Sequence, residues 1–233
     1  MLTLSRLETT PDLVDQVYQR LLAAISDGSM APGTRLTQED VAERLAVSRQ
    51  PVLQALRLLK ADGLVLEATG PQGQKGRGLV VAPIDVLAVI HIYEVRSTLD
   101  ALAARLAARQ CAQLDPALLV RGREAAAGQV VKDMVDADLA FHRAIYQASG
   151  NPLIAASAML HWCHIRRAMG EALQTSPLRA TVWDEHEAMC QAIVQGQEEQ
   201  AAQLMLDHGA QASQHLVHSL SRPHGPLPHS VVR

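Results

Sequence analysis

Residues 37–63 read TQEDVAERLAVSRQPVLQALRLLKADG, and this stretch decides the fold of the amino-terminal part of the chain. Thr37 can cap a short helix. Ser48 can cap the next helix, whose first turn holds Pro51, where a missing N–H is tolerated. After each cap, apolar residues recur at helical spacing until Gly63 interrupts the pattern. The stretch therefore predicts two helices joined by a tight turn.

The flanking residues extend this pattern into a larger module. Residues 14–25 repeat apolar side chains at helical spacing and are followed by Gly28. Residues 64–67 and 79–82 have the composition of short strands, with a Gly-rich loop between them. Helix, helix, turn, helix and a two-stranded wing make the order of a winged helix-turn-helix. We expect this module to span residues 1–83.

The rest of the chain predicts a helical bundle, so the fold class is mostly α. We expect an all-α bundle of six or seven helices over residues 84–221, serving effector binding and dimerisation, and a flexible tail over 222–233, which contains prolines and no helical period. The expected helices run over about 85–111, from 116, over 133–148, from 151, over 176–196 and over 198–220.

Composition narrows the function classes. With 48% hydrophobic and 19% charged residues, the chain can bury a core and is not disordered. Three scattered cysteines argue against a disulfide framework or a thiolate zinc site. The apolar runs are too short to span a bilayer, and residues 1–6 lack a signal core, so we expect a cytoplasmic protein without membrane contact. All ten histidines lie beyond residue 90, which indicates two modules with different tasks.

The first module has the side chains that DNA recognition requires. A recognition helix enters the major groove with polar residues at its N-terminal end, which here reads Ser48-Arg49-Gln50. A net charge of −3 excludes a uniformly basic coat and leaves open a charged face on a protein–protein module. The candidate DNA contacts are Arg35, Thr37, Ser48, Arg49, Gln50, Gln54, Arg57, Lys75 and Arg77.

The second module contains a candidate metal pair. Asp138 and His142 are four residues apart, so they share one helix face, and carboxylate with imidazole suits zinc, nickel, manganese or iron. The alternative is a simple surface contact. His186 and His208 lie on later helices, and the spacing alone does not bring them together.

Residues 32–83 resemble the DNA-binding domain of GntR-family transcriptional regulators. The resemblance rests on Pro-Gly-Thr-Arg-Leu (32–36), Val-Ala-Glu-Arg-Leu-Ala-Val-Ser-Arg-Gln-Pro-Val (41–52) and Ala-Asp-Gly-Leu-Val (61–65). It implies a homodimer on a short palindromic double-stranded DNA operator, usually released when a small metabolite binds.

The sequence departs from the family pattern at the operator side. Leu53 stands where an arginine commonly contacts DNA, Gln54 replaces a glutamate, and Glu39 occupies a position that is often basic or polar. The wing also looks lengthened by its Gly-rich insertion. We therefore expect DNA binding with an altered sequence preference, to which Arg49 and the wing contribute more.

The helical remainder is similar to the FCD effector domain of the FadR-type branch. Asp138-Leu-Ala-Phe-His142-Arg-Ala-Ile, followed by Ala148-Ser-Gly-Asn-Pro152, resembles the signature of the first two metal ligands, and the stretches around His186 and His208 resemble those of the others. The resemblance implies a divalent metal held by Asp138, His142, His186 and His208. It also implies a small carboxylate effector near Arg96, with Arg143 as a weaker candidate contact.

Three functions are compatible with these features. The favoured one is a metabolite-responsive DNA-binding regulator, acting as a repressor or an activator. The alternatives are a metal-dependent hydrolase and a metal-stabilised scaffold. Hydrolysis needs a positioned general base, and the chain has no H-E-x-x-H helix. Glu185 and Glu187 flank His186 and are expected to point away from a metal bound there.

Overall fold

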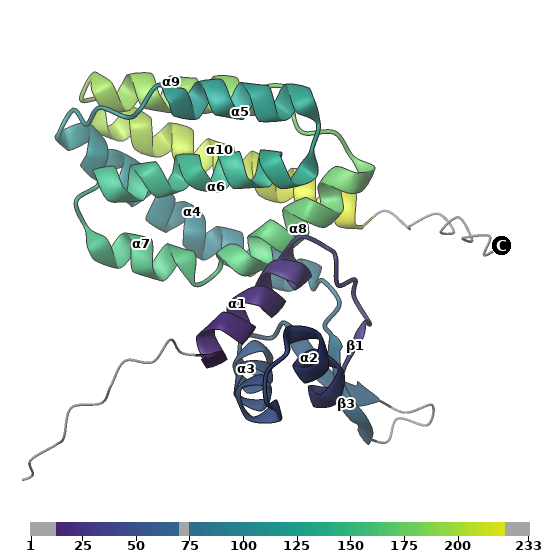
Figure 1. The fold of residues 1–233 in the computed structure, drawn as a ribbon. Coiled ribbons are helices and arrows are strands. Elements are labelled where there is room, and N and C mark those ends of the chain that lie inside the picture. Colours follow the sequence, from purple (N-terminus) through teal and green to yellow (C-terminus); the bar gives the residue numbers. More distant parts are fainter. Residues whose placement is uncertain (1–12, 70–74, 222–233) are drawn as a thin grey trace, which may run out of the picture. The chain divides into compact units, whose positions relative to one another are not determined.

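The computed structural model describes residues 13–69 and 75–221 and divides the chain into two compact units, Met1–Ile84 and Asp85–Arg233 (Figure 1). The expected tail over 222–233 and the Gly-rich residues 70–74 of the expected wing loop lie outside the described residues. No helix among the described residues is long and apolar enough to cross a membrane.

The described part of the first unit contains three helices: α1 (Leu13–Ser26), α2 (Gln38–Leu45) and α3 (Arg49–Ala61). The Thr37 hydroxyl accepts a hydrogen bond from the backbone N–H of Asp40 at 3.1 Å, as the sequence predicts for an N-cap. Ala46 ends α2 in the left-handed region, at φ 52°, and this allows the tight turn into α3. The unit's buried apolar residues come mainly from α1 and α3: Val17, Leu21, Ile25, Val52, Ala55, Leu56 and Leu59.

A three-stranded antiparallel sheet completes the unit, in the order β1-β3-β2. The strands are β1 (Arg35–Leu36), β2 (Val65–Thr69) and β3 (Lys75–Val81). Both strands of the expected wing are present as β2 and β3, and β1 adds a third strand that the sequence did not predict, because a two-residue strand has no alternation to recognise. β3 also starts earlier than expected, since Lys75 pairs with Thr69 inside the stretch that its glycines suggested was loop.

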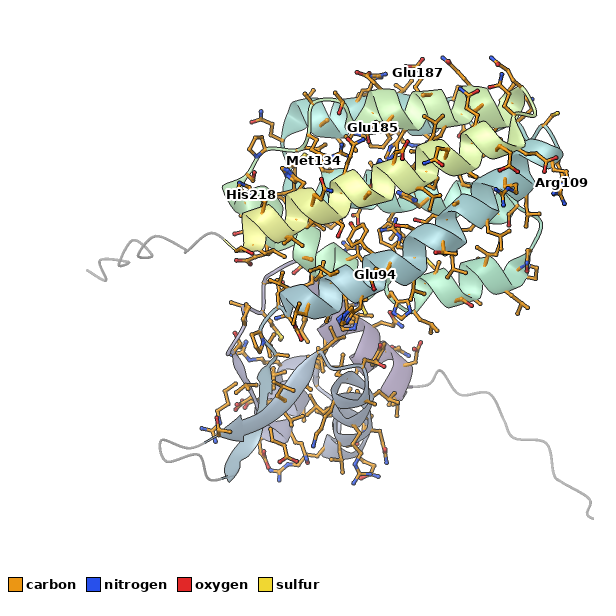
Figure 2. All side chains as sticks on the ribbon, turned by 180° about the vertical axis from the view of Figure 1, so that it is seen from behind. Glu94, Arg109, Met134, Glu185, Glu187 and His218 are labelled. Carbon is orange, nitrogen blue, oxygen red and sulfur yellow. The ribbon has the colours of Figure 1, made fainter. Side chains whose placement is uncertain are left out.

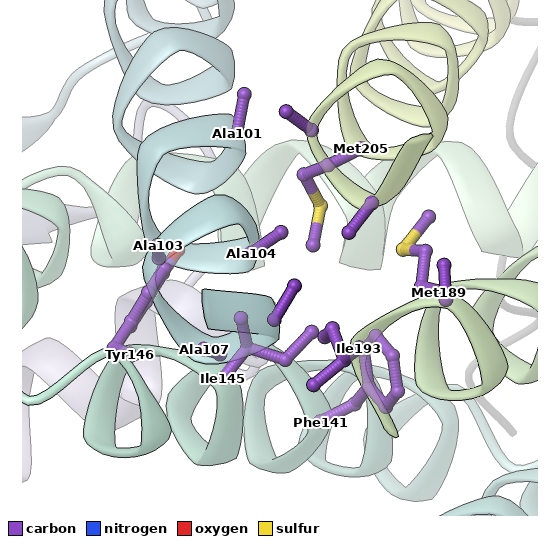
Figure 3. Packing of buried hydrophobic residues seen from close by; sticks show 14 of the residues in the cluster. Ala101, Ala103, Ala104, Ala107, Phe141, Ile145, Tyr146, Met189, Ile193 and Met205 are labelled. Atoms are coloured by element: carbon purple, nitrogen blue, oxygen red, sulfur yellow. The ribbon is translucent and has the colours of Figure 1, made fainter. Parts of the chain in front are cut away.

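The second unit is a bundle of seven described helices: α4 (Val86–Arg109), α5 (Ala117–Gly128), α6 (Val131–Ala148), α7 (Pro152–Met159), α8 (Trp162–Thr175), α9 (Val182–Val194) and α10 (Glu198–Leu220). The helix expected from residue 151 is two helices, broken at Leu160 and His161. The helix expected from residue 176 begins at Val182 instead. Its core gathers small residues of α4 against Phe141, Ile145, Met189, Ile193 and Met205 (Figure 3).

Two glycines allow close packing in this bundle. A Cβ at Gly209 of α10 would collide with the Ser97 hydroxyl of α4, and a Cβ at Gly122 of α5 would collide with the indole of Trp183 on α9. The absence of a side chain therefore brings α10 against α4 and α5 against α9. The first contact places His208, the neighbour of Gly209, close to the helix that carries Arg96.

Candidate metal centre

Four buried side chains from three helices meet inside the second unit. Asp138 and His142 lie one turn apart on α6, while His186 comes from α9 and His208 from α10. Each offers one ligand atom, and these atoms all lie within 4.8 Å of one another. The structure thus brings together the four positions that the resemblance implied.

The facing atoms are the Nε2 atoms of the histidines and one carboxylate oxygen. His186 Nε2 lies 3.4 Å from His208 Nε2 and 3.7 Å from Asp138 Oδ1. His142 Nε2 lies 3.9 Å from the same Asp138 oxygen. Phe141 stacks on the His186 ring, with centroids 3.9 Å apart, and limits its rotation.

Glu185 orients one of these histidines. Its Oε2 lies 2.8 Å from His208 Nδ1, so an Nδ1–H donated there leaves the Nε2 lone pair facing the site. Arg179 and Thr181 also donate to Glu185. Burial opposes ionisation of Glu185, but the hydrogen bonds from His208, Arg179 and Thr181 outweigh it and hold its pKa well below the ordinary value. Glu185 does not face the metal position, as expected, but it contacts a ligand.

Asp100 of α4 occupies a similar position beside His142. Its Oδ2 lies 3.6 Å from His142 Nδ1 and 3.1 Å from Arg96 Nε, and its Oδ1 accepts a hydrogen bond from Tyr146 at 2.5 Å. The Arg96 guanidinium lies over the Trp162 ring, 4.1 Å from its centroid. The sequence did not predict a site role for Asp100, Glu185 or Arg179, because the role of each is apparent only from its contact with a residue on another element.

The donor set fits a divalent metal ion. Burial, with neighbouring positive charge, lowers the pKa of His142 and His186 well below the ordinary value, so both imidazoles are neutral and offer lone pairs. Within the described residues, both ring nitrogens of His142 and the Nδ1 of His186 have no hydrogen-bond partner. Burial also raises the pKa of Asp138. A cation among these groups would compensate the charge of the buried carboxylate and would accept the Nε2 lone pairs of the histidines.

A cavity of about 50 Å³ adjoins this quartet. Its wall includes Asp138, His142 and His208, together with Tyr93 and Arg96 of α4. Desolvation raises the pKa of Tyr93 to about 12, so its hydroxyl stays protonated and can donate a hydrogen bond.

Arg143 does not share this cavity. It follows His142 directly on α6, and its side chain is exposed and absent from the cavity wall. Arg179, from the segment before α9, lines the cavity instead. Its role could not be assigned from the sequence, because it lies outside every expected motif.

The remaining histidines lie outside the quartet. His161 and His164, the rival pair, lie at the start of α8, and among the described residues only the quartet brings three or more metal-ligating side chains together. His218 is exposed (Figure 2), but His215 lines the cavity rather than lying in solvent. His224 and His229 lie outside the described residues.

The first unit has a groove of about 820 Å³ between α2, α3 and the sheet, lined by Arg35, Thr37, Glu39, Leu53, Arg57 and Lys60 among others. Ser48, Arg49 and Gln50 are exposed at the start of α3. Gln54 is half-buried, and the Thr37 hydroxyl is engaged in capping α2. Lys75 and Arg77 lie in β3, where the structure describes only their backbone.

Two of the basic side chains on this surface are paired with acids. Arg49 Nη1 lies 3.0 Å from Glu39 Oε1, and Lys60 Nζ lies 2.7 Å from Glu67 Oε1. Both pairs are exposed and therefore weak. Binding of DNA here would exchange these carboxylates for phosphate or base contacts.

Comparison with known families identifies the chain. Residues 13–71 match the gntR family of bacterial regulatory proteins, and residues 91–211 match the FCD domain. The chain belongs to the GntR family. As a GntR regulator it is a DNA-binding transcriptional regulator and not an enzyme, which removes the hydrolase alternative.

Relatives of this GntR regulator agree with the assignment. It is 26% identical over 215 residues to the HTH-type transcriptional regulator YdhC of Bacillus subtilis, covering 88% of this chain and 91% of YdhC. It is 31% identical over 148 residues to the HTH-type transcriptional repressor RspR of Escherichia coli, covering 61% of this chain and 62% of RspR. GntR regulators bind DNA operators, typically as dimers.

Solved structures share the fold. A GntR regulator from Rhodococcus sp. RHA1 gives a TM-score of 0.71 at 22% identity, covering 88% of this chain and 97% of that one. McbR/YncC of E. coli gives a TM-score of 0.72 at 20% identity, covering 89% and 98%. FCD domains commonly bind metals, and this one has a buried His/Asp group that could hold one.

Proposed function

We propose that this GntR regulator is metabolite-responsive, binding a palindromic operator as a homodimer whose DNA affinity is controlled by a small organic acid bound at a metal site in the helical unit. The observation that carries the proposal is the buried quartet of Asp138, His142, His186 and His208 beside a cavity that Arg96 also lines.

The quartet would hold zinc, nickel, manganese or iron, since three imidazoles and one carboxylate suit each of them. The bound ion would supply a Lewis acid for a carboxylate oxygen of the effector. Glu185 positions His208, Asp100 lies 3.6 Å from His142 Nδ1, and the Tyr93 hydroxyl is available to donate a hydrogen bond to the acid. Arg96 lines the cavity wall as the ion-pair partner of Asp100. The exposed Arg143 is not carried into this proposal.

The DNA-binding surface comprises the start of α3 and the groove beside it. We assign base reading to Arg49 and Gln50 and phosphate contacts to Ser48, Arg35 and Arg57, with Thr37, Gln54, Lys75 and Arg77 as further contacts. Arginine suits guanine edges and phosphate, and glutamine suits adenine. The DNA-binding domain is proposed to span 1–83 and the effector and dimerisation domain 84–221, followed by a flexible tail, in a cytoplasmic repressor.

The coupling between the two functions rests on the chain connection. Residues 82–85 alone join β3 to α4, the helix that carries Tyr93, Arg96 and Asp100. An acid that favours one conformation of the dimer shifts the population toward it and changes operator affinity by its differential binding energy.

The test combines genomic selection with a matched pair of variants. In the first experiment, fragments of the source genome bound by the metal-loaded protein are sequenced in the presence and absence of a panel of organic acids. In the second, metal content is measured in the His208→Ala variant and in the matched control His218→Ala, which replaces an exposed histidine on the same helix. We expect one palindrome, released by an acid, and metal loss in His208→Ala alone. Equal metal content in both variants contradicts the quartet, and thermal stabilisation by metal but by no acid favours the scaffold.

A further inference from the structure

Along α10, the wall of the cavity beside the quartet becomes largely apolar beyond His208, with His215 as its polar exception. His208, Ala212 and Leu216 follow at intervals of about one turn on α10, and all three line the cavity. Leu216 lies roughly 12 Å along the helix axis from His208, at ~1.5 Å per residue. The apolar part of the wall comprises Met169, Leu173, Leu178, Val182, Ala212 and Leu216, from α8, the segment before α9, α9 and α10.

The charges at the cavity leave room for one anion. Arg96 is paired with Asp100 at 3.1 Å, and Arg179 with Glu185 at 2.7 Å, so these four groups compensate one another. A divalent ion bound by the Asp138 carboxylate and by three imidazole lone pairs therefore retains one positive charge. A single carboxylate neutralises it, whereas a second carboxylate would be buried against apolar side chains without a counter-charge.

The cavity beside the quartet is small, at about 50 Å³. The hydroxyl groups of a sugar acid would face carbon atoms along most of its wall.

We propose that the effector is a short monocarboxylate with an apolar tail, its carboxylate at the quartet and its tail against Met169, Leu173 and Leu216. The proposal rests on the proposed function, because it takes the metal-bound quartet as the anion site. It excludes dicarboxylates and sugar acids as the effector.

Butyrate and succinate provide the decisive comparison, because both have four carbons and succinate replaces a methyl group with a second carboxylate. The zinc-loaded full chain is titrated with each acid by calorimetry, with zinc content measured before and after. We expect butyrate to bind at least tenfold more tightly than succinate. Succinate binding as tightly as butyrate, or more tightly, overturns the proposal.

Two methionine variants test the position of the tail. Met169→Ala shortens a side chain of the apolar wall and so enlarges the cavity. Met159→Ala makes the same substitution on α7, at a methionine that does not line the cavity. Met169→Ala should raise the affinity ratio of hexanoate to butyrate at least fivefold, and Met159→Ala should leave it unchanged. An unchanged ratio in a folded, zinc-loaded Met169→Ala protein overturns the assignment of this wall to the tail.

The outcomes separate this proposal from the one beneath it. If the chain retains zinc and binds succinate in preference to butyrate, the metal-dependent regulator stands and the monocarboxylate class is wrong. If the chain retains none of zinc, nickel, manganese and iron and binds neither acid, the proposed function itself fails.

Discussion

Each unit of the protein contains an arginine–carboxylate pair of nearly the same length in opposite surroundings. Arg49 and Glu39 lie 3.0 Å apart with side chains 68% and 58% exposed, whereas Arg96 and Asp100 lie 3.1 Å apart with side chains 4% and 5% exposed. Water screens the first pair, and its carboxylate can be exchanged for a phosphate at small cost. The second pair has lost its water, so each partner depends on the other. The two ion pairs have nearly the same length. Because only the second is buried, the arginine of the first pair can exchange its carboxylate for a phosphate, whereas the partners of the second cannot separate without a large cost.

Removing the arginine of each pair should give the largest contrast. Arg96→Leu leaves Asp100 as an uncompensated buried charge and should lower the free energy of unfolding by about 3–5 kcal/mol. Arg49→Leu should lower it by less than about 1 kcal/mol. Urea unfolding of both proteins, followed by circular dichroism, measures the two losses. Equal losses would mean that burial does not distinguish the pairs.

A double variant sharpens this result. Arg96→Leu combined with Asp100→Asn removes both charges, so part of the lost stability should return. A double variant no more stable than Arg96→Leu alone would trace the loss to packing on Trp162 rather than to the buried charge.

The carboxylate that orients His208 should matter for metal affinity. Glu185→Gln keeps the shape of the side chain but removes its charge, and should weaken metal binding about tenfold to a hundredfold. Glu187→Gln is the matched control, because Glu187 lies on the same helix and pairs with Arg123 instead (Figure 2). Competition with a chromogenic chelator measures both affinities. Similar affinities for the two variants would remove Glu185 from the site.

Arg49 should matter for the operator despite its weak pairing. Arg49→Ala should cost about 1–3 kcal/mol of operator binding if it reads a base. Gel retardation with the selected operator and with unrelated DNA separates the sequence-specific part of the binding free energy from the nonspecific part. An affinity equal to that of the parent would exclude Arg49 from the interface.

The smallest effect should come from the acid of the exposed pair. Glu39→Gln frees Arg49 and removes a charge that repels phosphate, so DNA affinity should rise by a factor that corresponds to less than about 1 kcal/mol. The salt dependence of binding should become steeper, since one more cation is available for phosphate. A lower affinity would indicate that Glu39 itself contacts the DNA.

Local sequence patterns were sufficient to predict the bounds of those helices that begin at a capping residue or end at a glycine. Thr37 and Gly63 bounded α2 and α3 correctly to within a residue or two, and Asp85 starts α4 as a cap. The break between α7 and α8 has no glycine or proline to mark it, so the two helices merged into one in the prediction. Pro177 suggested a helix start that the structure places at Val182.

The site was predictable only in part, for a similar reason. Asp138 and His142 share a face by helix geometry, and the resemblance supplied His186 and His208. Arg143 could have been set aside, because consecutive helical residues point about 100° apart. The roles of Asp100 and Glu185 could not be predicted from residue spacing within one helix, because they depend on packing between helices that are far apart in the chain.

Both tryptophans of the chain lie beside the quartet. The Trp162 ring centroid is 5.6 Å from that of His142, and the Trp183 centroid is 4.6 Å from that of His186. All of the protein's intrinsic indole emission therefore originates next to the candidate ligand positions, and none arises in the first unit. The unlabelled protein carries two optical probes of this one site, and a change in emission on adding a metal or an acid reports on the helical unit alone.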